Sequence, residues 1–251
     1  MYIRSTRITL PQGCISGILH WEAGKIVEIL DDHQPVPIDL DVGDHRILPG
    51  IIDTHNHGTL GYGAMGFEGD VEKELRGYLK GLASQGVTGV LPTTDIQGFE
   101  TAAKLADEVV DGAKVLGIHS EGPYLNRVGE KGIDTGHPDI CLDDLKQMVK
   151  KAQGKLKLVA LAPELPDARQ AIEYLTSVNV RTAFAHSNMM FEEANEAFRW
   201  GITVSTHTAN VMSGIHHRNM GGLGACLLND DLVNEVICDG KHICNAMLEL
   251  M

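Results

Sequence analysis

From residue 50 onward, apolar runs typical of strands alternate with amphipathic runs typical of helices. Strands are expected at 50–58, 87–95, 114–121, 156–164, 182–187, 202–208 and 234–239, and helices at 71–84, 101–110, 142–152, 168–178 and 191–200. This alternation predicts a parallel sheet, and repeats of about thirty residues favour a (β/α)8 barrel over a doubly wound sheet. A closed barrel needs eight strands and seven are counted. The expected fold class is therefore α/β, a TIM barrel truncated after about seven strands.

The first 48 residues have a different pattern. Short, apolar and β-branched runs at 4–10, 17–21 and 25–30 are separated by glycines, and no helical period is present. This pattern predicts a small, incomplete, sandwich-like β domain over residues 1–48 and a barrel domain over residues 49–251. Three explanations of the missing eighth strand stay open: a fragment, a disordered C-terminal part, or a shortened protein completed by association.

Composition excludes several classes of protein. The formal net charge of −13 argues against a nucleic acid or an anionic membrane as partner. Neither a transmembrane run nor the apolar stretch of a signal peptide is present, so a cytoplasmic protein is expected. The five scattered cysteines favour free thiols, and the twelve histidines suit a metal enzyme.

Residues able to bind a metal recur at the ends of the predicted strands, where β/α barrels carry their reactive groups. His55 and His57 are two residues apart at the end of the first strand, so both rings point to one face. Glu121, His186 and His207 end the third, fifth and sixth strands. Each alone has an ordinary explanation, such as a hydrogen-bonded histidine or a carboxylate that caps a turn. Together they predict a site for one or two divalent ions, Zn²⁺ or Fe²⁺.

Several motifs carry a resemblance to a known family. They are Pro-Gly-Ile-Ile-Asp-Thr-His-Asn-His-Gly (49–58), Glu-Gly-Pro-Tyr-Leu (121–125), Leu-Ala-Pro-Glu (161–164), His-Thr-Ala-Asn-Val-Met (207–212) and Asp-Gly-Lys-His (239–242). In this order they resemble N-acetylglucosamine-6-phosphate deacetylases, which are metal-dependent amidohydrolases. The resemblance implies hydrolysis of the N-acetyl group of N-acetylglucosamine 6-phosphate, or of a close amino-sugar phosphate, to the free amine and acetate. It also implies a homodimer.

The resemblance assigns roles to the metal-binding candidates. Glu121, His186 and His207 match the principal metal ligands of the family. His55 and His57 match the pair of the first strand that holds a second metal in some members. The implied reaction is attack of an activated water on the acetyl carbonyl.

It also assigns roles in substrate binding. Asn210 and Val211 match positions that contact the sugar phosphate, Arg218 matches a phosphate-binding arginine, and His242 matches a histidine that contacts substrate. His137 matches the histidine that polarises the acetyl carbonyl, although its spacing from the third strand is longer than in the family pattern.

The chain departs from the family at the acid/base aspartate, which the family carries on the eighth strand. Asp239 belongs to the motif of the seventh strand, Asp53 is expected to orient the first-strand histidines, and His119 is expected to be structural. Two alternatives stay open. One is a remnant that binds metal and sugar phosphate without turnover. The other is an amidohydrolase of cyclic amides, which is less favoured because the fourth strand (156–164) does not end with a lysine for carboxylation.

Overall fold

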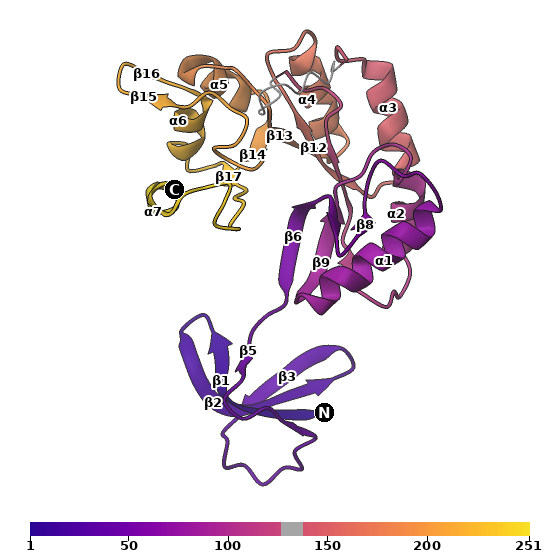
Figure 1. Cartoon of the computed structure of the whole chain (residues 1–251), viewed down its shortest axis with the longest axis vertical. Coiled ribbons are helices and arrows are strands. Elements are labelled where there is room, and N and C mark those ends of the chain that lie inside the picture. The colour runs from indigo at the N-terminus through magenta and orange to yellow at the C-terminus, as the bar shows by residue number, and fades with distance from the viewer. Residues whose placement is uncertain (127–137) are drawn as a thin grey trace. The chain divides into compact units, whose positions relative to one another are not determined.

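The computed structural model describes residues 1–126 and 138–251, and it divides into two compact units, Met1–Ile51 and Ile52–Met251 (Figure 1). The sequence pattern places this division three residues earlier, between residues 48 and 49. No helix in the described ranges is both long enough and apolar enough to span a bilayer.

The unit Met1–Ile51 contains one five-stranded sheet. Its strands are β1 (Tyr2–Leu10), β2 (Gly13–Glu22), β3 (Lys25–Leu30), β4 (Leu40–Asp41) and β5 (Arg46–Ile47). β1, β2 and β3 form an antiparallel meander, whereas β4 and β5 pair with β1 in parallel. Ala23 and Gly24 both have positive φ angles, of 49° and 77°, as a tight hairpin turn between β2 and β3 requires.

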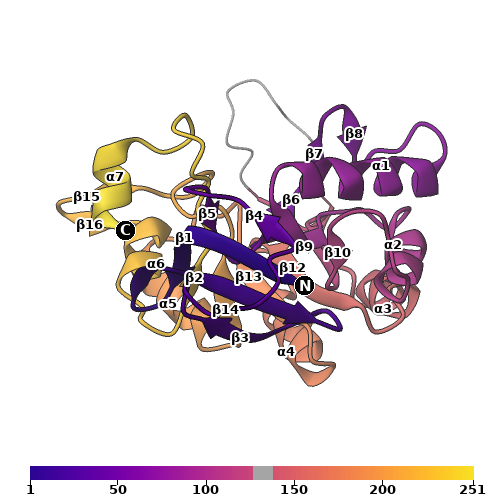
Figure 2. The same ribbon diagram turned by 90° about the horizontal axis from the view of Figure 1, so that it is seen from below.

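The unit Ile52–Met251 is built on a row of parallel strands (Figure 2). They are β6 (Ile51–Asn56), β9 (Val87–Pro92), β10 (Lys114–Val115), β11 (Ile118–Glu121), β12 (Leu156–Leu161), β13 (Arg181–Phe184), β14 (Ile202–Ser205) and β17 (Val233–Asn234). β10 and β11 lie in one predicted strand, and a parallel bridge between Thr93 and His119 joins the β10-β9-β6 sheet to the β11-β12-β13-β14-β17 sheet. The expected α/β class is confirmed, with the strands in chain order.

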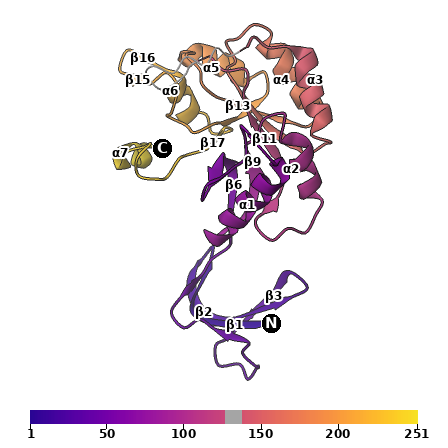
Figure 3. The ribbon, with the colours of Figure 1, turned by 45° about the vertical axis from the view of Figure 1, so that its right-hand side comes forward.

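Helices follow the strands along the chain (Figure 3). They are α1 (Val71–Ser84), α2 (Phe99–Ala106), α3 (Leu142–Lys151), α4 (Ala168–Ser177), α5 (Phe191–Phe198), α6 (Gly222–Leu227) and α7 (Asn245–Leu250). The five predicted helices are confirmed, and their ends differ from the expected ones by at most four residues. In α1 the carboxylate of Asp70 accepts hydrogen bonds from the backbone N–H groups of Glu72 and Lys73, which fixes the helix start.

The largest error in the predicted elements concerns the seventh strand. It was expected over residues 234–239, but β17 contains only Val233 and Asn234. Farther on, the Asp239 carboxylate accepts hydrogen bonds from the backbone N–H groups of Lys241 and His242, so the chain turns instead of extending. α6 and the hairpins β7–β8 (Gly58–Thr59, Tyr62–Gly63) and β15–β16 (Ile215–His216, Asn219–Met220) were not predicted, because such short elements carry no periodic signal.

The two faces of the strands have different environments. In β12, Val159 and Leu161 belong to the main core with the helices, whereas Leu158 and Ala160 belong to a second buried cluster. Glu121 of β11 is in register with Ala160, so it lies on the face turned away from the helices. This face, at the carboxyl ends of the strands, carries the candidate site.

Candidate metal centre

The five predicted metal ligands come from four strand ends of the unit Ile52–Met251. His55 lies in β6 and His57 directly follows it, and Glu121 is the last residue of β11. His186 and His207 each come two residues after the end of a strand, β13 and β14 respectively. Because these strands are parallel, their carboxyl ends meet at one edge. The structure brings all five side chains together there.

Glu121 lies at the centre of this cluster. Its Oε1 atom is 2.9 Å from His186 Nε2 and 3.0 Å from His207 Nε2. Its Oε2 atom is 2.9 Å from His57 Nε2 and 3.5 Å from His55 Nε2. The two nitrogens of each pair are also close, 3.1 Å apart for His186 and His207 and 3.0 Å apart for His55 and His57. One carboxylate therefore bridges two pairs of imidazoles.

The cluster fits a divalent cation by its chemistry. Imidazole nitrogens and carboxylate oxygens are ligands that Zn²⁺ and similar ions accept. Two neutral imidazole nitrogens about 3 Å apart repel each other unless a proton or a cation lies between them. Four side chains of the cluster are only 11–16% exposed, whereas that of His57 is 44% exposed. Burial alone raises the pKa of Glu121, but the surrounding histidines outweigh burial and hold this pKa far below its ordinary value.

Backbone strain accompanies the metal-binding candidates that follow β13 and β14. His186 and His207 have φ angles of 47° and 32°, and Ala209 and Val211 in the following loop have φ angles of 80° and 51°. Left-handed backbone is costly for residues other than glycine, above all for a β-branched residue, and such strain gathers at functional sites. Asn210 donates hydrogen bonds from its backbone N–H and from its side-chain amide to the carbonyl of His207, at 2.8 and 3.2 Å. The predicted substrate contacts Asn210 and Val211 thus lie in a strained loop beside a metal-binding candidate.

Glu235 is a residue of this region that the sequence reasoning missed. It directly follows β17, and one carboxylate oxygen accepts a hydrogen bond of 2.5 Å from the Thr54 hydroxyl. The other oxygen is 3.8 Å from His55 Nδ1, on the side of the ring away from Glu121. Burial lowers the pKa of His55, but Glu121 and Glu235 together raise it to about 9. The sequence signal that could have identified Glu235 is an acidic residue inside a predicted apolar strand.

His119 and Asp53 lie behind the cluster. His119 is buried, and its Nδ1–H donates a hydrogen bond of 3.0 Å to the Thr54 carbonyl. Burial lowers the pKa of His119 to about 3, so its ring is neutral, and it meets the His55 ring edge to face at 4.6 Å. Asp53 accepts hydrogen bonds from the backbone N–H of His55 and from the Asn56 side chain. Asp53 therefore holds the backbone of β6 and not the histidine rings.

The remaining predicted substrate residues lie on other elements. Arg218 is in the turn of the β15–β16 hairpin and lines a cavity of about 270 Å³ with His217 and Glu192. His242 is exposed, and its ring lies 2.8 Å from the carboxylate of Asp239 in the turn after β17. His137, the predicted carbonyl-polarising residue, lies outside the described residues.

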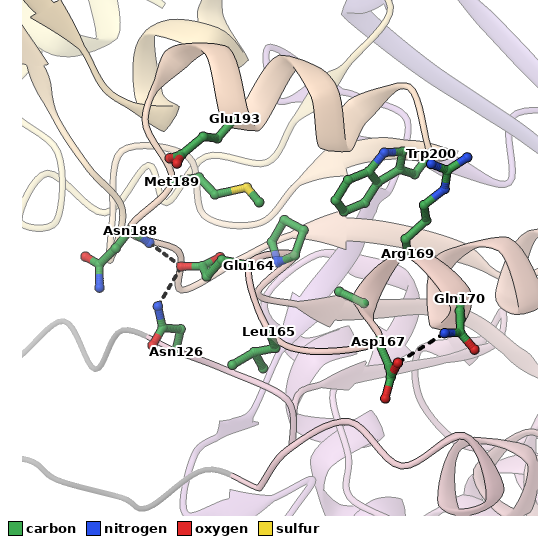
Figure 4. A pocket seen from close by; sticks show the side chains of 12 residues that line it. Asn126, Glu164, Leu165, Asp167, Arg169, Gln170, Asn188, Met189, Glu193 and Trp200 are labelled. Carbon is green, nitrogen blue, oxygen red and sulfur yellow. Dashed lines mark hydrogen bonds between the residues drawn. The ribbon is translucent and has the colours of Figure 1, made fainter.

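A larger cavity, of about 630 Å³, opens beside the ends of β12 and β13 (Figure 4). Its described lining includes none of the five metal-binding candidates. There the Glu164 carboxylate accepts hydrogen bonds from the Asn126 amide at 2.7 Å, the Ser187 hydroxyl at 2.7 Å and the Asn188 backbone N–H at 2.6 Å. Because Ser187 follows His186, Glu164 ties the segment that carries this metal-binding candidate to the end of β12.

The chain was compared with known proteins. No family model matches it. It is 34% identical over 246 residues to N-acetylgalactosamine-6-phosphate deacetylase of Escherichia coli O157:H7, a match that covers 88% of this chain and 63% of the relative. It is 32% identical over 221 residues to N-acetylglucosamine-6-phosphate deacetylase of Vibrio furnissii, which covers 83% of this chain and 54% of the relative. The chain thus spans between 54% and 63% of the length of these two curated relatives.

Solved structures of N-acetylglucosamine-6-phosphate deacetylases share the fold of this chain. N-acetyl-D-glucosamine-6-phosphate deacetylase from Mycobacterium smegmatis superposes with a TM-score of 0.84 at 24% identity, over 99% of this chain and 71% of that chain. The enzyme from Thermotoga maritima superposes with a TM-score of 0.76 at 26% identity, over 100% of this chain and 66% of that chain. The present chain therefore shares the α/β fold of these deacetylases over the part that superposes.

Proposed function

We propose that this chain, a homologue of the N-acetylglucosamine-6-phosphate deacetylases, hydrolyses the N-acetyl group of N-acetylglucosamine 6-phosphate or of a close amino-sugar 6-phosphate. The single observation that carries the proposal is the cluster in which Glu121 lies between two pairs of histidines. The curated relatives named above act on the glucosamine and galactosamine esters, and a variant of the Mycobacterium smegmatis enzyme was solved in complex with N-acetyl-D-glucosamine-6-phosphate. These names support a phosphorylated amino sugar as the substrate.

The metal centre is proposed to hold up to two divalent ions, Zn²⁺ or Fe²⁺. Glu121 forms one group of donor atoms with His186 and His207 and a second group with His55 and His57. When bound, a divalent cation supplies the Lewis acidity that activates water and polarises an amide carbonyl at neutral pH. The chain itself contributes a preorganised and mostly buried set of side chains, with His186 and His207 held by strained backbone.

The reaction adds water across the amide bond. The water oxygen bonds to the acetyl carbon, the carbon–nitrogen bond breaks, and a proton reaches the departing amine. His137 keeps its proposed role of polarising the acetyl carbonyl. Among the described residues we assign no carboxylate to the transfer of the proton to the amine.

The sugar phosphate is proposed to contact Asn210, Val211, Arg218 and His242. The position of Asn210 and Val211 beside His207 supports their role. Arg218 suits a phosphate because its guanidinium donates paired hydrogen bonds, and its place in a hairpin turn leaves it accessible.

Two further points of organisation remain proposals. The first is that the parallel strands from β6 to β17, with β10 and β11 counted as one strand, are the first seven of an eight-stranded barrel, which their chain order supports. The second is a homodimer, which rests on the resemblance alone. Light scattering behind size exclusion tests the dimer directly.

The proposed function is tested by acetate release from N-acetylglucosamine 6-phosphate and N-acetylgalactosamine 6-phosphate. The purified chain is supplied separately with Zn²⁺ and Fe²⁺. Release that falls by ~100-fold or more in Glu121→Gln and His207→Ala supports the proposal. His33→Ala, which removes an exposed histidine of the other unit, is the matched control and leaves release unchanged. Metal bound without acetate from either sugar contradicts the catalytic claim and leaves the alternative of a protein that binds metal, and the sugar phosphate, without turnover.

A further inference from the structure

We infer that Glu235 is a positioning residue, which holds His55 so that the Nε2 atom of this histidine faces the metal centre. The inference rests on the proposed metal centre and adds a residue that the resemblance does not assign. It concerns metal binding and not the transfer of a proton.

The two nitrogens of His55 face different partners. Nε2 lies 3.0 Å from His57 Nε2 and 3.5 Å from Glu121 Oε2, on the side of the metal centre. Nδ1 lies 3.8 Å from Glu235 Oε2 on the opposite side. A carboxylate beside Nδ1 favours the tautomer with its proton on Nδ1, which leaves the lone pair of Nε2 for a cation. This is the arrangement by which proteins orient histidines that bind metals.

The Glu235 side chain is held in place by one hydrogen bond, and its other carboxylate oxygen can still accept one. It is only 11% exposed, and its Oε1 accepts the hydrogen bond from the Thr54 hydroxyl. Its Oε2 is buried and has no hydrogen-bond partner in the described structure. A buried carboxylate oxygen without a partner is costly. The donor positioned to remove this cost is Nδ1–H of His55, 3.8 Å from Glu235 Oε2. An interaction between the two groups therefore stabilises this orientation of the His55 ring.

The backbone of Glu235 links the site to the other pair of histidines. Its N–H donates to the carbonyl of Ser205 at 2.9 Å, and its carbonyl accepts from the N–H of Thr208 at 2.7 Å. Ser205 and Thr208 flank the segment that carries His207. Glu235 is thus fixed by its backbone to the loop of His207 and by its side chain to β6. Glu235 therefore fixes His55 of β6 relative to His207, which follows β14.

A double-mutant cycle with metal binding as its readout tests this inference. Zn²⁺ affinity and stoichiometry are measured by equilibrium dialysis with metal analysis for the wild type, Glu235→Ala, His55→Ala and the double variant. If Glu235 acts through His55, Glu235→Ala weakens Zn²⁺ binding by about 10- to 100-fold, and it adds nothing further in the His55→Ala background. Additive losses, or no loss in Glu235→Ala, overturn the inference.

Two controls separate positioning from general damage to the fold. Glu235→Gln keeps the size of the side chain and an oxygen for Nδ1–H but loses the charge, so its affinity lies between those of the wild type and Glu235→Ala. Asp70→Asn removes the charge of a carboxylate that caps α1 and contacts no metal-binding candidate in the described hydrogen bonds, and it leaves Zn²⁺ affinity unchanged. Circular dichroism of the metal-free proteins shows whether each variant folds.

The outcome is independent of the deacetylase proposal. A chain that releases no acetate but shows the non-additive cycle keeps the positioning role and loses the proposed activity. A chain that releases acetate, with Zn²⁺ binding insensitive to both His55→Ala and Glu235→Ala, keeps the activity and overturns the positioning role.

Discussion

Glu121 and Glu164 are both carboxylates near the ends of neighbouring strands, yet their surroundings differ in kind. Glu164 accepts hydrogen bonds from an amide, a hydroxyl and a backbone N–H, each of which brings its own hydrogen. Glu121 faces four imidazole nitrogens, which bond to it only when they are protonated or when a cation lies between. All the hydrogen-bond donors that Glu164 needs are therefore present in the protein. Glu121 needs a proton or a cation between itself and the imidazoles, which is the setting expected of the metal-binding carboxylate proposed above.

The largest effect is expected from Glu121→Gln. This change removes the charge that joins both histidine pairs, so Zn²⁺ affinity falls on the order of 100-fold or more. Glu164→Gln is the variant for comparison, because it makes the same chemical change in a carboxylate that is surrounded by hydrogen-bond donors instead of imidazoles. Equilibrium dialysis measures both affinities, and an equal loss in the two variants would remove the distinction drawn above.

The next effect is a pH dependence of the metal-free protein. The pKa of His55 in the folded protein, about 9, exceeds its ordinary value of 6.5. The contribution of protonated His55 to the free energy of unfolding is therefore fully present below pH 6.5 and is lost as the pH rises through 9. The upper bound of this contribution is on the order of 3 kcal/mol. Thermal unfolding of the metal-free chain should thus show a lower Tm at pH 9.5 than at pH 6.5.

The metal-loaded protein should show the opposite trend, because histidines bind a cation only when they are deprotonated. His55→Ala should flatten the pH dependence of the metal-free protein. A Tm of the metal-free wild type that stays constant or rises between these two pH values contradicts the assignment.

A smaller effect is expected from Glu164→Ala. It leaves three hydrogen-bond donors without their acceptor near the Asn188 loop, which costs on the order of 2 kcal/mol of unfolding free energy. Urea denaturation of the metal-free protein measures this loss. Zn²⁺ affinity should change far less than in Glu121→Gln, and a loss of the same size as in that variant would show that the two carboxylates are not separate in function.

The smallest effect is expected from Asp70→Ala, where a carboxylate only caps a helix. Loss of its two hydrogen bonds to the start of α1 costs on the order of 1 kcal/mol. Urea denaturation again gives the value, with Asp70→Ser as a control that retains a capping oxygen. A cost above that of Glu164→Ala would show that the Glu164 contacts contribute little.

The predicted elements were most accurate where the pattern was long. α1 matches its expected range at both ends, because its buried residues Leu75, Tyr78, Leu79 and Leu82 recur at the helical period and Asp70 marks the start. The seventh strand was overextended, since an apolar run does not show whether a strand has neighbours or turns away. The hairpin that carries Arg218 was missed because each of its strands has only two residues.

The order of strands and helices, and the polar residues that end the strands, could be predicted without a structure because periodicity and strand ends are local properties. That was enough to name His55, His57, Glu121, His186 and His207 as one group. The folded arrangement was needed to show that Glu121 lies between two histidine pairs and that Glu235 lies beside His55 Nδ1. Glu235 is 180 residues from His55 along the chain, and contacts between side chains on different strands depend on register and backbone angles that no local pattern contains.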